Sequence, residues 1–225
     1  MISGLRQIWP LLLLTAAVIA LWSTPMLLPL KMLVVFFHEF SHLLTALLTG
    51  GSPEALTLTP HQGGMVLSRG GNRFLILSSG YLGSLLIGLA IFLTALSSRA
   101  DRWVTAGLGG LLLLVAAFYI RDGFALAFTV TSGTVLLITA SWLGHAACDL
   151  LLRLIGLTSM IYVPLDIFSD TLERADQRSD ARLMAEEFGG LTIVWGILWL
   201  FLSLWVIALA LRLTLSRSRR AALRG

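Results

Sequence analysis

Long apolar stretches follow one another along most of the chain, and they limit it to a membrane-embedded fold. They lie near residues 8–30, 32–49, 74–97, 104–120, 124–157 and 191–212. About 20 apolar residues suffice to cross a bilayer as a helix. The composition agrees, because 57% of the residues are hydrophobic and only 12% are charged, against roughly 25% charged residues in a soluble domain. We therefore predict an all-α polytopic membrane protein with about six transmembrane helices.

Two features of these stretches bear on the topology. The stretch 124–157 is too long for one straight crossing and contains Gly133 and Gly144. It is therefore either one crossing with a buried half-helix or two short crossings. Six crossings would place both termini on one side of the membrane, and Arg6 and the arginine-rich end of the chain favour a cytoplasmic location for both. We find no internal repeat or linker, so we predict one domain over residues 1–225.

Two connections between the apolar stretches are long enough to have structure of their own. Between residues 50 and 73, Leu and Thr alternate before a Gly-Gly pair, and a second short apolar run follows. This pattern predicts a β-hairpin over Leu56–Ser68, after the second helix. The connection at residues 158–190 holds 7 of the 12 acidic residues. It is the main source of carboxylates for a functional site.

The pentapeptide His38-Glu39-Phe40-Ser41-His42 places three ionisable side chains inside an apolar stretch. On a helix, His38 and His42 are one turn apart on one face, where both imidazoles can bind the same metal ion. Glu39 can then act as the general base towards a water molecule activated by that ion. Ionisable groups inside a membrane span are costly and mark function. The pattern predicts a metal-dependent hydrolase with His38 and His42 as ligands.

A catalytic zinc ion usually has three protein ligands and one open position. We predict Asp166 as the third ligand, because it lies where the sequence changes from apolar to acidic and because apolar residues surround it. Asp170, one helical turn later, is a weaker alternative. Glu54 follows Gly50-Gly51 too closely to turn back towards the histidines. Ser41 is expected to donate a hydrogen bond to the Phe37 carbonyl oxygen, and His61 is expected in the hairpin turn.

Asp149 is a further alternative ligand, since it shares helical spacing with His145 and Cys148. The simpler interpretation pairs Asp149 with Arg153 one turn later and leaves His145 in a polar core contact. The same residues, with the acidic connection, would also suit a cation path in a transporter. The single cysteine excludes an internal disulfide. The basic tail belongs to no folded basic surface, so we expect no nucleic-acid partner.

The chain resembles the site-2-protease superfamily of intramembrane zinc metalloproteases, and within it the small branch without a PDZ domain. The resemblance rests on the His-Glu-x-x-His motif in an early span, on Gly50-Gly51 before a hairpin, and on the later Gly80-Tyr-Leu-Gly83-Ser84. It implies a Zn²⁺ cofactor held by His38, His42 and an aspartate of a late Leu-Asp-Gly motif. That aspartate corresponds to Asp166 of Leu165-Asp166. The resemblance also implies a membrane-anchored protein substrate and Glu39 as the base.

The chain departs from this family pattern in two places. Ile167 follows Asp166 where the family has Gly, and the Asn-x-x-Pro element before the aspartate is absent. The group that stabilises the oxyanion is therefore unidentified. The segments Leu165–Asp170 and Ser179-Asp180-Ala181 are similar to the protease-like branch of the family. We predict a multi-pass protein of a bacterial cell membrane that hydrolyses peptide bonds; the alternatives are a non-catalytic chaperone or scaffold and the cation transporter.

Overall fold

The computed structural model describes residues 2–97, 100–174 and 177–222. Its regular elements, in chain order, are α1 (Ile2–Ala20), α2 (Leu28–Leu48), β1 (Ser52–Thr59), β2 (Gly63–Arg69), α3 (Arg73–Ser97), α4 (Asp101–Tyr119), α5 (Gly123–Ile138), α6 (Gly144–Phe168), α7 (Asp180–Phe188) and α8 (Thr192–Ala222). Short helical turns η1 (Pro25–Leu27), η2 (Thr139–Leu143) and η3 (Ser169–Glu173) connect some of them. The predicted helical fold with one hairpin after the second helix is confirmed.

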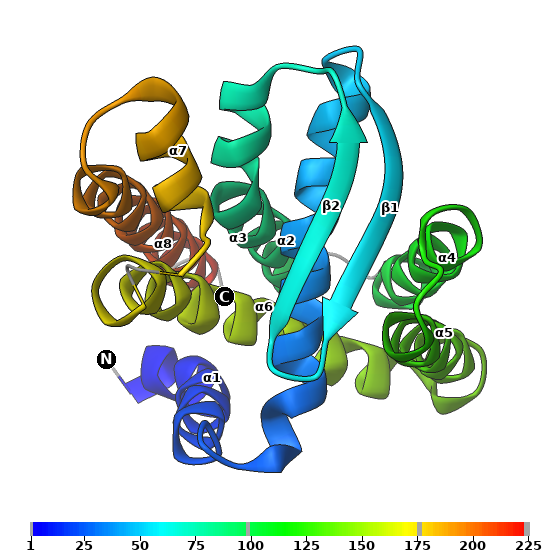
Figure 1. The fold of residues 1–225 in the computed structure, drawn as a ribbon. Helices are drawn as coiled ribbons and strands as arrows, with labels where there is room; N and C mark the ends of the chain where they lie inside the picture. The colour runs from blue at the N-terminus through cyan, green and yellow to red at the C-terminus, as the bar shows by residue number, and fades with distance from the viewer. Residues whose placement is uncertain (1, 98–99, 175–176, 223–225) are drawn as a thin grey trace.

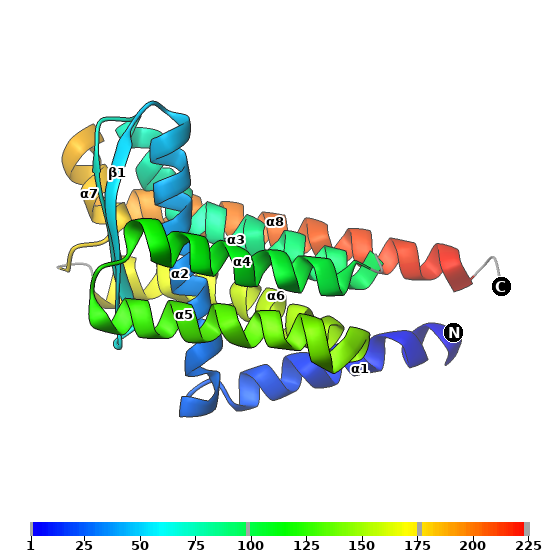
Figure 2. The same cartoon turned by 90° about the vertical axis from the view of Figure 1, so that its right-hand side faces the viewer.

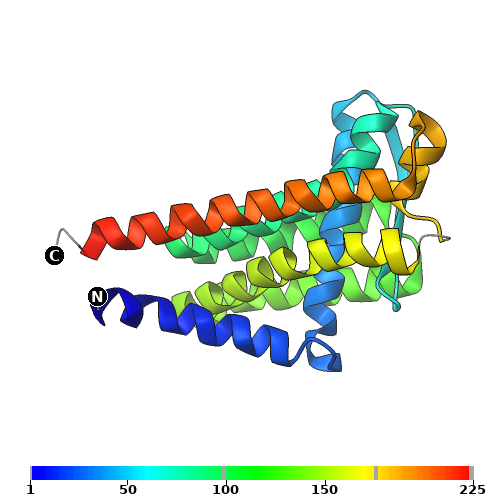
Figure 3. The same ribbon diagram turned by 90° about the vertical axis from the view of Figure 1, so that its left-hand side faces the viewer.

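Most of the long helices form a bundle in which the helix axes are roughly aligned. Figures 2 and 3 show α1, α4, α5, α6, α8 and most of α3 running alongside one another, whereas α2 crosses them near one end. The first turns of α1 and the last turns of α8 lie at the opposite end of the bundle. The first and last described residues therefore lie on one side of the bundle, as an even number of crossings would place them. That this side is cytoplasmic stays a prediction.

Among the described residues, five helical stretches are long and apolar enough to span a membrane. They are Pro25–Leu48, Arg73–Leu96, Asp101–Tyr119, Gly123–Glu173 and Thr192–Arg212, and the shorter Trp9–Ala20 is also apolar. The fourth stretch contains two helices, α5 and α6, which run in opposite directions (Figure 2). The chain reverses at Gly144, whose φ of 81° favours glycine. Residues 124–157 therefore belong to two separate helices, which agrees with the interpretation as two crossings. The bacterial origin stays a prediction.

Glycines bring α3 and α6 into close contact behind the crossing helix. A Cβ added at Gly88 of α3 would lie 2.1 Å from Cβ of Ser159, and one at Gly156 of α6 would lie 2.5 Å from Cβ of Phe92. Helices in a bilayer gain little from the hydrophobic effect when they associate, so small residues that permit close packing are favoured. These contacts provide a fixed platform for α2.

The hairpin covers α2 at the end of the bundle away from the termini. Figure 1, which looks along the bundle, shows both strands lying over α2, with α4 and α5 on one side and α7 and α8 on the other. The strands are antiparallel, with Leu56 opposite Val66. Leu56 and Leu58 of β1 are buried in the same hydrophobic core as Phe36 and Phe37 of α2. The alternating pattern thus gives the hairpin one face that packs on the helix.

Candidate metal centre

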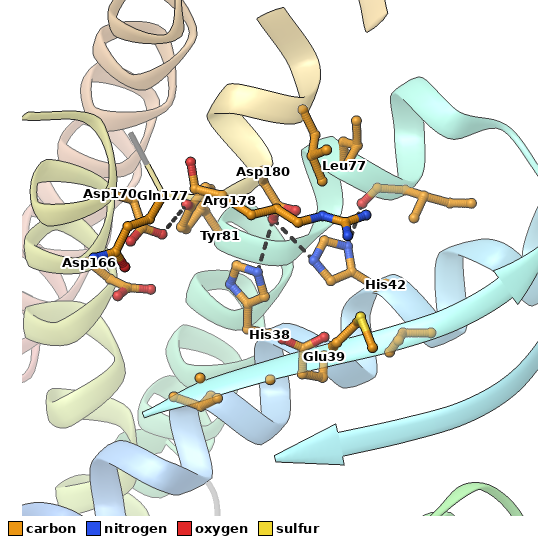
Figure 4. A pocket seen from close by; sticks show the side chains of 18 of the residues that line it. His38, Glu39, His42, Leu77, Tyr81, Asp166, Asp170, Gln177, Arg178 and Asp180 are labelled. Atoms are coloured by element: carbon orange, nitrogen blue, oxygen red, sulfur yellow. Dashed lines mark hydrogen bonds and ion pairs between the residues drawn. The ribbon is translucent and has the colours of Figure 1, made fainter. Parts of the chain in front are cut away.

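Helix α2 presents His38 and His42 on one face, as their spacing predicts. Their ring centroids are 4.7 Å apart, and the two planes make an angle of 75°. The neighbouring Phe36 and Phe37 are fully buried. This packing holds the helix in register, so the two imidazoles point together into a pocket rather than into lipid (Figure 4).

Asp180 completes the group of possible ligands. Its Oδ2 lies 2.9 Å from Nε2 of His38 and 3.1 Å from Nε2 of His42, and Figure 4 shows the carboxylate facing both rings. The possible ligand atoms of these three residues all lie within 4.8 Å of one another, which is close enough to hold one metal ion. No other group of three His, Cys, Asp or Glu side chains in the described part of the chain meets this condition.

Asp180 owes its position to the start of α7. Ser179 caps this helix, because its Oγ accepts a hydrogen bond from the backbone N–H of Arg182 at 3.3 Å. Ala181 and Met184 are buried and attach α7 to the protein core. Asp180 is therefore the first residue of a capped, anchored helix. Its carboxylate is fixed opposite the histidines, although 142 residues separate it from His38.

The predicted third ligand, Asp166, is not a member of this group. Asp166 lines the same pocket, but its Oδ1 faces Nη2 of Arg174 at 3.6 Å. The weaker alternative, Asp170, accepts hydrogen bonds from the Tyr81 hydroxyl at 2.6 Å and from Arg174 at 2.8 Å. Arg174 and Tyr81 engage these two carboxylates, and Asp180 is the carboxylate that lies beside both histidines. In the sequence, Asp180 stands in the family-like segment Ser179-Asp180-Ala181.

The cluster around Asp149 does not form a metal site in the structure. Oδ1 of Asp149 accepts a hydrogen bond from Nε of Arg153 at 2.7 Å, which is the simpler pairing that the spacing predicts. Nδ1 of His145 lies 3.2 Å from Oδ2 of Asp101 on α4, and Cys148 contacts the Thr139 carbonyl oxygen. The three candidate ligands therefore have different partners. The transporter interpretation is therefore not favoured.

A backbone contact fixes the orientation of His42. Its Nδ1 lies 2.7 Å from the carbonyl oxygen of Ile76 on α3. Because a carbonyl oxygen only accepts, Nδ1 carries the proton and donates it. Nε2 points at Asp180 and is the ring nitrogen that a metal ion would bind. Histidines that bind metals are usually oriented by such a contact of the second ring nitrogen.

Gly80 of α3 leaves the space that the three ligands occupy. A Cβ at this position would lie 2.4 Å from Nε2 of His38 and 2.5 Å from Oδ2 of Asp180. Real Cβ contacts are almost never this short. Gly80 belongs to the family-like segment Gly80-Tyr-Leu-Gly83-Ser84, and the close approach of the ligands requires a residue without a side chain at this position. Tyr81 beside it places its ring 4.9 Å from the ring of His38, edge to face.

The electrostatics around Asp180 keep its carboxyl group ionised. Burial would raise the pKa of Asp180, but the positive charges and hydrogen bonds of His42 and His38 outweigh burial and hold this pKa well below its usual range. A carboxylate must be deprotonated to bind a metal ion. Asp180 therefore meets this condition in the metal-free protein.

Glu39 lies beside the ligands and beneath the hairpin. Its side chain is only 5% exposed, and a Cβ at Gly64 of β2 would lie 2.6 Å from its Oε1. Glycine at this point of β2 therefore lets the strand pass directly over the carboxylate. Glu39 also lines the pocket, and among the described residues it has no hydrogen bond or ion pair. Its carboxylate is free to exchange a proton with a molecule in the pocket.

Three other polar residues that the sequence brings into consideration have partners or positions of their own. The Ser41 hydroxyl donates to the Phe37 carbonyl oxygen at 2.7 Å. His61 lies in the hairpin turn, and Glu54 forms an ion pair with Arg69 across the hairpin. None of these side chains belongs to the ligand group.

The pocket around the ligands has a volume of about 470 Å³. Helices α2 and α3, strand β2, η3 and the start of α7 line it. Two imidazole nitrogens and one carboxylate oxygen are a donor set typical of catalytic zinc sites. Together with the space that Gly80 leaves and the fixed tautomer of His42, this donor set fits a zinc ion. The described residues His38, His42 and Asp180 are those that would hold it.

Comparison with known proteins agrees with this geometry. The family model described as Peptidase M50B-like matches residues 11–210 of the chain. No curated protein and no solved structure matches it. The matched region includes all of α2 to α7, and with them the three candidate ligands and Glu39. The chain belongs to the peptidase M50B-like family, which is the site-2-protease family of membrane metalloproteases.

Proposed function

We propose that this protein is an intramembrane zinc metalloprotease that hydrolyses peptide bonds of membrane-anchored proteins. The observation that supports this best is the convergence of His38, His42 and Asp180 beside the free carboxylate of Glu39. When bound, zinc supplies Lewis-acid chemistry: it polarises the scissile carbonyl and increases the acidity of the attacking water. The protein has to supply the ligands, a base and a means of presenting the substrate.

Strand β2 offers a way to present the substrate. Residues 63–68 of β2 line the pocket, and in the described structure the sheet has two strands, so one edge of β2 is not paired with β1. A peptide in a helix hides its carbonyl groups in helical hydrogen bonds and must unwind to be cut. An extended substrate segment would pair with the open edge of β2. Its scissile carbonyl would then lie above the histidines.

Glu39 would move the proton during hydrolysis. Its carboxylate accepts a proton from water as the water oxygen forms a bond with the carbonyl carbon, and the carbonyl π electrons move to the oxygen. When the C–N bond breaks, Glu39 returns this proton to the leaving nitrogen. The products are a carboxylic acid and an amine, so one water is consumed for each bond cut.

The test is cleavage of a reporter with one membrane anchor, by purified protein reconstituted with zinc in liposomes. We expect the wild-type protein to cut it. Glu39→Gln should lower the rate by about 10²–10⁴-fold, because it removes the base. Its zinc content should not change, because Glu39 is not a ligand. Glu186→Gln is the matched control, since Glu186 is exposed and, among the described residues, pairs with Arg182 one turn away. Such surface pairs contribute little.

Equal processing of the reporter by wild type and Glu39→Gln would contradict the protease proposal. A wild-type protein that binds zinc but cuts no reporter would favour the non-catalytic chaperone or scaffold. Substrates other than the reporter can be compared in the same assay, with Glu39→Gln as the blank.

A further inference from the structure

Hydrolysis of an amide builds negative charge on the carbonyl oxygen. The family element expected to stabilise this charge, Asn-x-x-Pro, is absent from this chain. Donors aimed at such an oxyanion are among the largest contributions to catalysis. The proton that Glu39 takes from water goes on to the leaving nitrogen, so Glu39 is not available as a donor to the oxyanion. The pocket has three positively charged candidates, which are Arg73, Arg174 and Arg178.

Two of these arginines already have acidic partners. Nη2 of Arg73 lies 2.9 Å from Oε1 of Glu187. Arg174 pairs with Asp170 at 2.8 Å and lies 3.6 Å from Asp166. Their guanidinium groups are held at the pocket wall. Among the described residues, Arg178 has no hydrogen bond or ion pair.

The third candidate is also the one placed closest in sequence to the metal ligands. Arg178 is two residues before Asp180, and the cap at Ser179 fixes the chain between them. Just before it, the Gln177 N–H donates a hydrogen bond to the Arg174 carbonyl oxygen at 2.8 Å. In Figure 4 the Arg178 side chain extends past Asp180 towards His42. Its guanidinium thus lies on the pocket side of the ligands.

Tyr81 is the neutral donor that competes with Arg178. Its ring packs against His38, but its hydroxyl donates to Oδ2 of Asp170 at 2.6 Å. A hydroxyl has one proton to donate, and Asp170 already receives it. Tyr81 therefore positions His38 and Asp170, and its proton is not available for a substrate oxygen.

We propose that Arg178 is a catalytic residue that donates hydrogen bonds to the oxyanion formed on the scissile carbonyl. This proposal rests on the proposed protease function. A guanidinium group remains charged at every relevant pH and has five N–H donors. It can therefore reach a substrate oxygen from its exposed position while Asp180 stays in place. In this protein, Arg178 would stabilise the oxyanion in place of the missing Asn-x-x-Pro element.

The experiment compares Arg178→Gln and Arg178→Lys with wild type in the liposome assay. We expect Arg178→Gln to lower kcat by about 10²–10³-fold, as loss of an oxyanion donor does in other hydrolases. KM and zinc content should stay unchanged, and Arg178→Lys should recover part of kcat because it restores one charged donor. Arg121→Gln is the control, since Arg121 lies outside the pocket and donates to backbone carbonyl oxygens at the end of α4.

A second readout does not depend on turnover. A peptide phosphinate mimics the tetrahedral, negatively charged state, so its Kd for the zinc-loaded protein should rise by a similar factor in Arg178→Gln. A higher KM with unchanged kcat would overturn the proposal, because it indicates uniform substrate binding. Loss of zinc would also overturn it, since Arg178 would then only position Asp180. If wild type binds no phosphinate and cuts no reporter, the protease function fails instead.

Discussion

Asp180→Ala should empty the metal centre and end hydrolysis. The variant removes the carboxylate whose Oδ2 lies within 3.1 Å of both ligating imidazoles. Loss of a partner outside the ligand set already lowers metal affinity by about 10–100-fold, so loss of a ligand should exceed about 100-fold. The zinc content of purified protein after dialysis against a weak chelator measures this directly. Reporter cleavage should fall with it.

Asp166→Ala is the comparison that separates Asp180 from the ligand predicted by family resemblance. Asp166 lines the pocket but faces Arg174, so its removal should leave the zinc content unchanged. Asp170→Ala should also keep zinc, although it releases Tyr81 and Arg174. If Asp166→Ala loses zinc while Asp180→Ala keeps it, the family-based assignment is correct and the arrangement in the structure is not.

Gly80→Ala should disrupt the same centre through one added methyl group. The new Cβ would lie 2.4 Å from Nε2 of His38 and 2.5 Å from Oδ2 of Asp180. Since α3 is packed on both α2 and α6, its backbone cannot easily shift. The added methyl group would therefore displace His38 or Asp180. Overpacking of this kind destabilises by about 1–3 kcal/mol, and here the displaced atoms are metal ligands. We expect a loss of zinc and of reporter cleavage comparable to that of Asp180→Ala.

Gly110→Ala is the matched control for the substitution at Gly80. Gly110 lies inside membrane helix α4, and a Cβ there would meet no atom within 4 Å. Alanine in a helix interior is more favourable than glycine by about 0.5–1 kcal/mol. This variant should therefore keep its zinc and its activity. Zinc retained at the wild-type level in Gly80→Ala would show that the ligands are not as tightly enclosed as the structure indicates.

Elements set by local sequence were predicted well. The hairpin follows from alternating Leu and Thr before a Gly-Gly pair, and the structure extends it only slightly, to Ser52–Thr59 and Gly63–Arg69. The pairing of His38 with His42 depends only on helical geometry. The direction of α2 was not predicted. Hydropathy reports the length and apolarity of a segment, whereas its crossing of the bundle depends on packing against α3 and α6.

The sequence did not single out Asp180, because tertiary structure decides which carboxylate faces the histidines. Asp166 and Asp180 both follow the apolar part of α6 in sequence, and apolar neighbours favoured Asp166. In the structure η3 follows the end of α6, and the first residue of α7 lies at the histidines instead. The pattern Ser179-Asp180 before the buried Ala181 and Met184 marks a capped helix start. That signal could have placed Asp180 at a fixed position, but not opposite α2.

X-ray absorption at the zinc edge of the purified wild-type protein is the most direct test of the His38–His42–Asp180 centre. We expect one zinc ion per chain with two histidine nitrogens at about 2.0–2.1 Å and a carboxylate oxygen at about 2.0–2.2 Å. The histidine signal should disappear with the zinc in His38→Ala. A zinc-free wild-type protein, or a zinc ion with sulfur from Cys148 in its shell, would contradict the proposed centre.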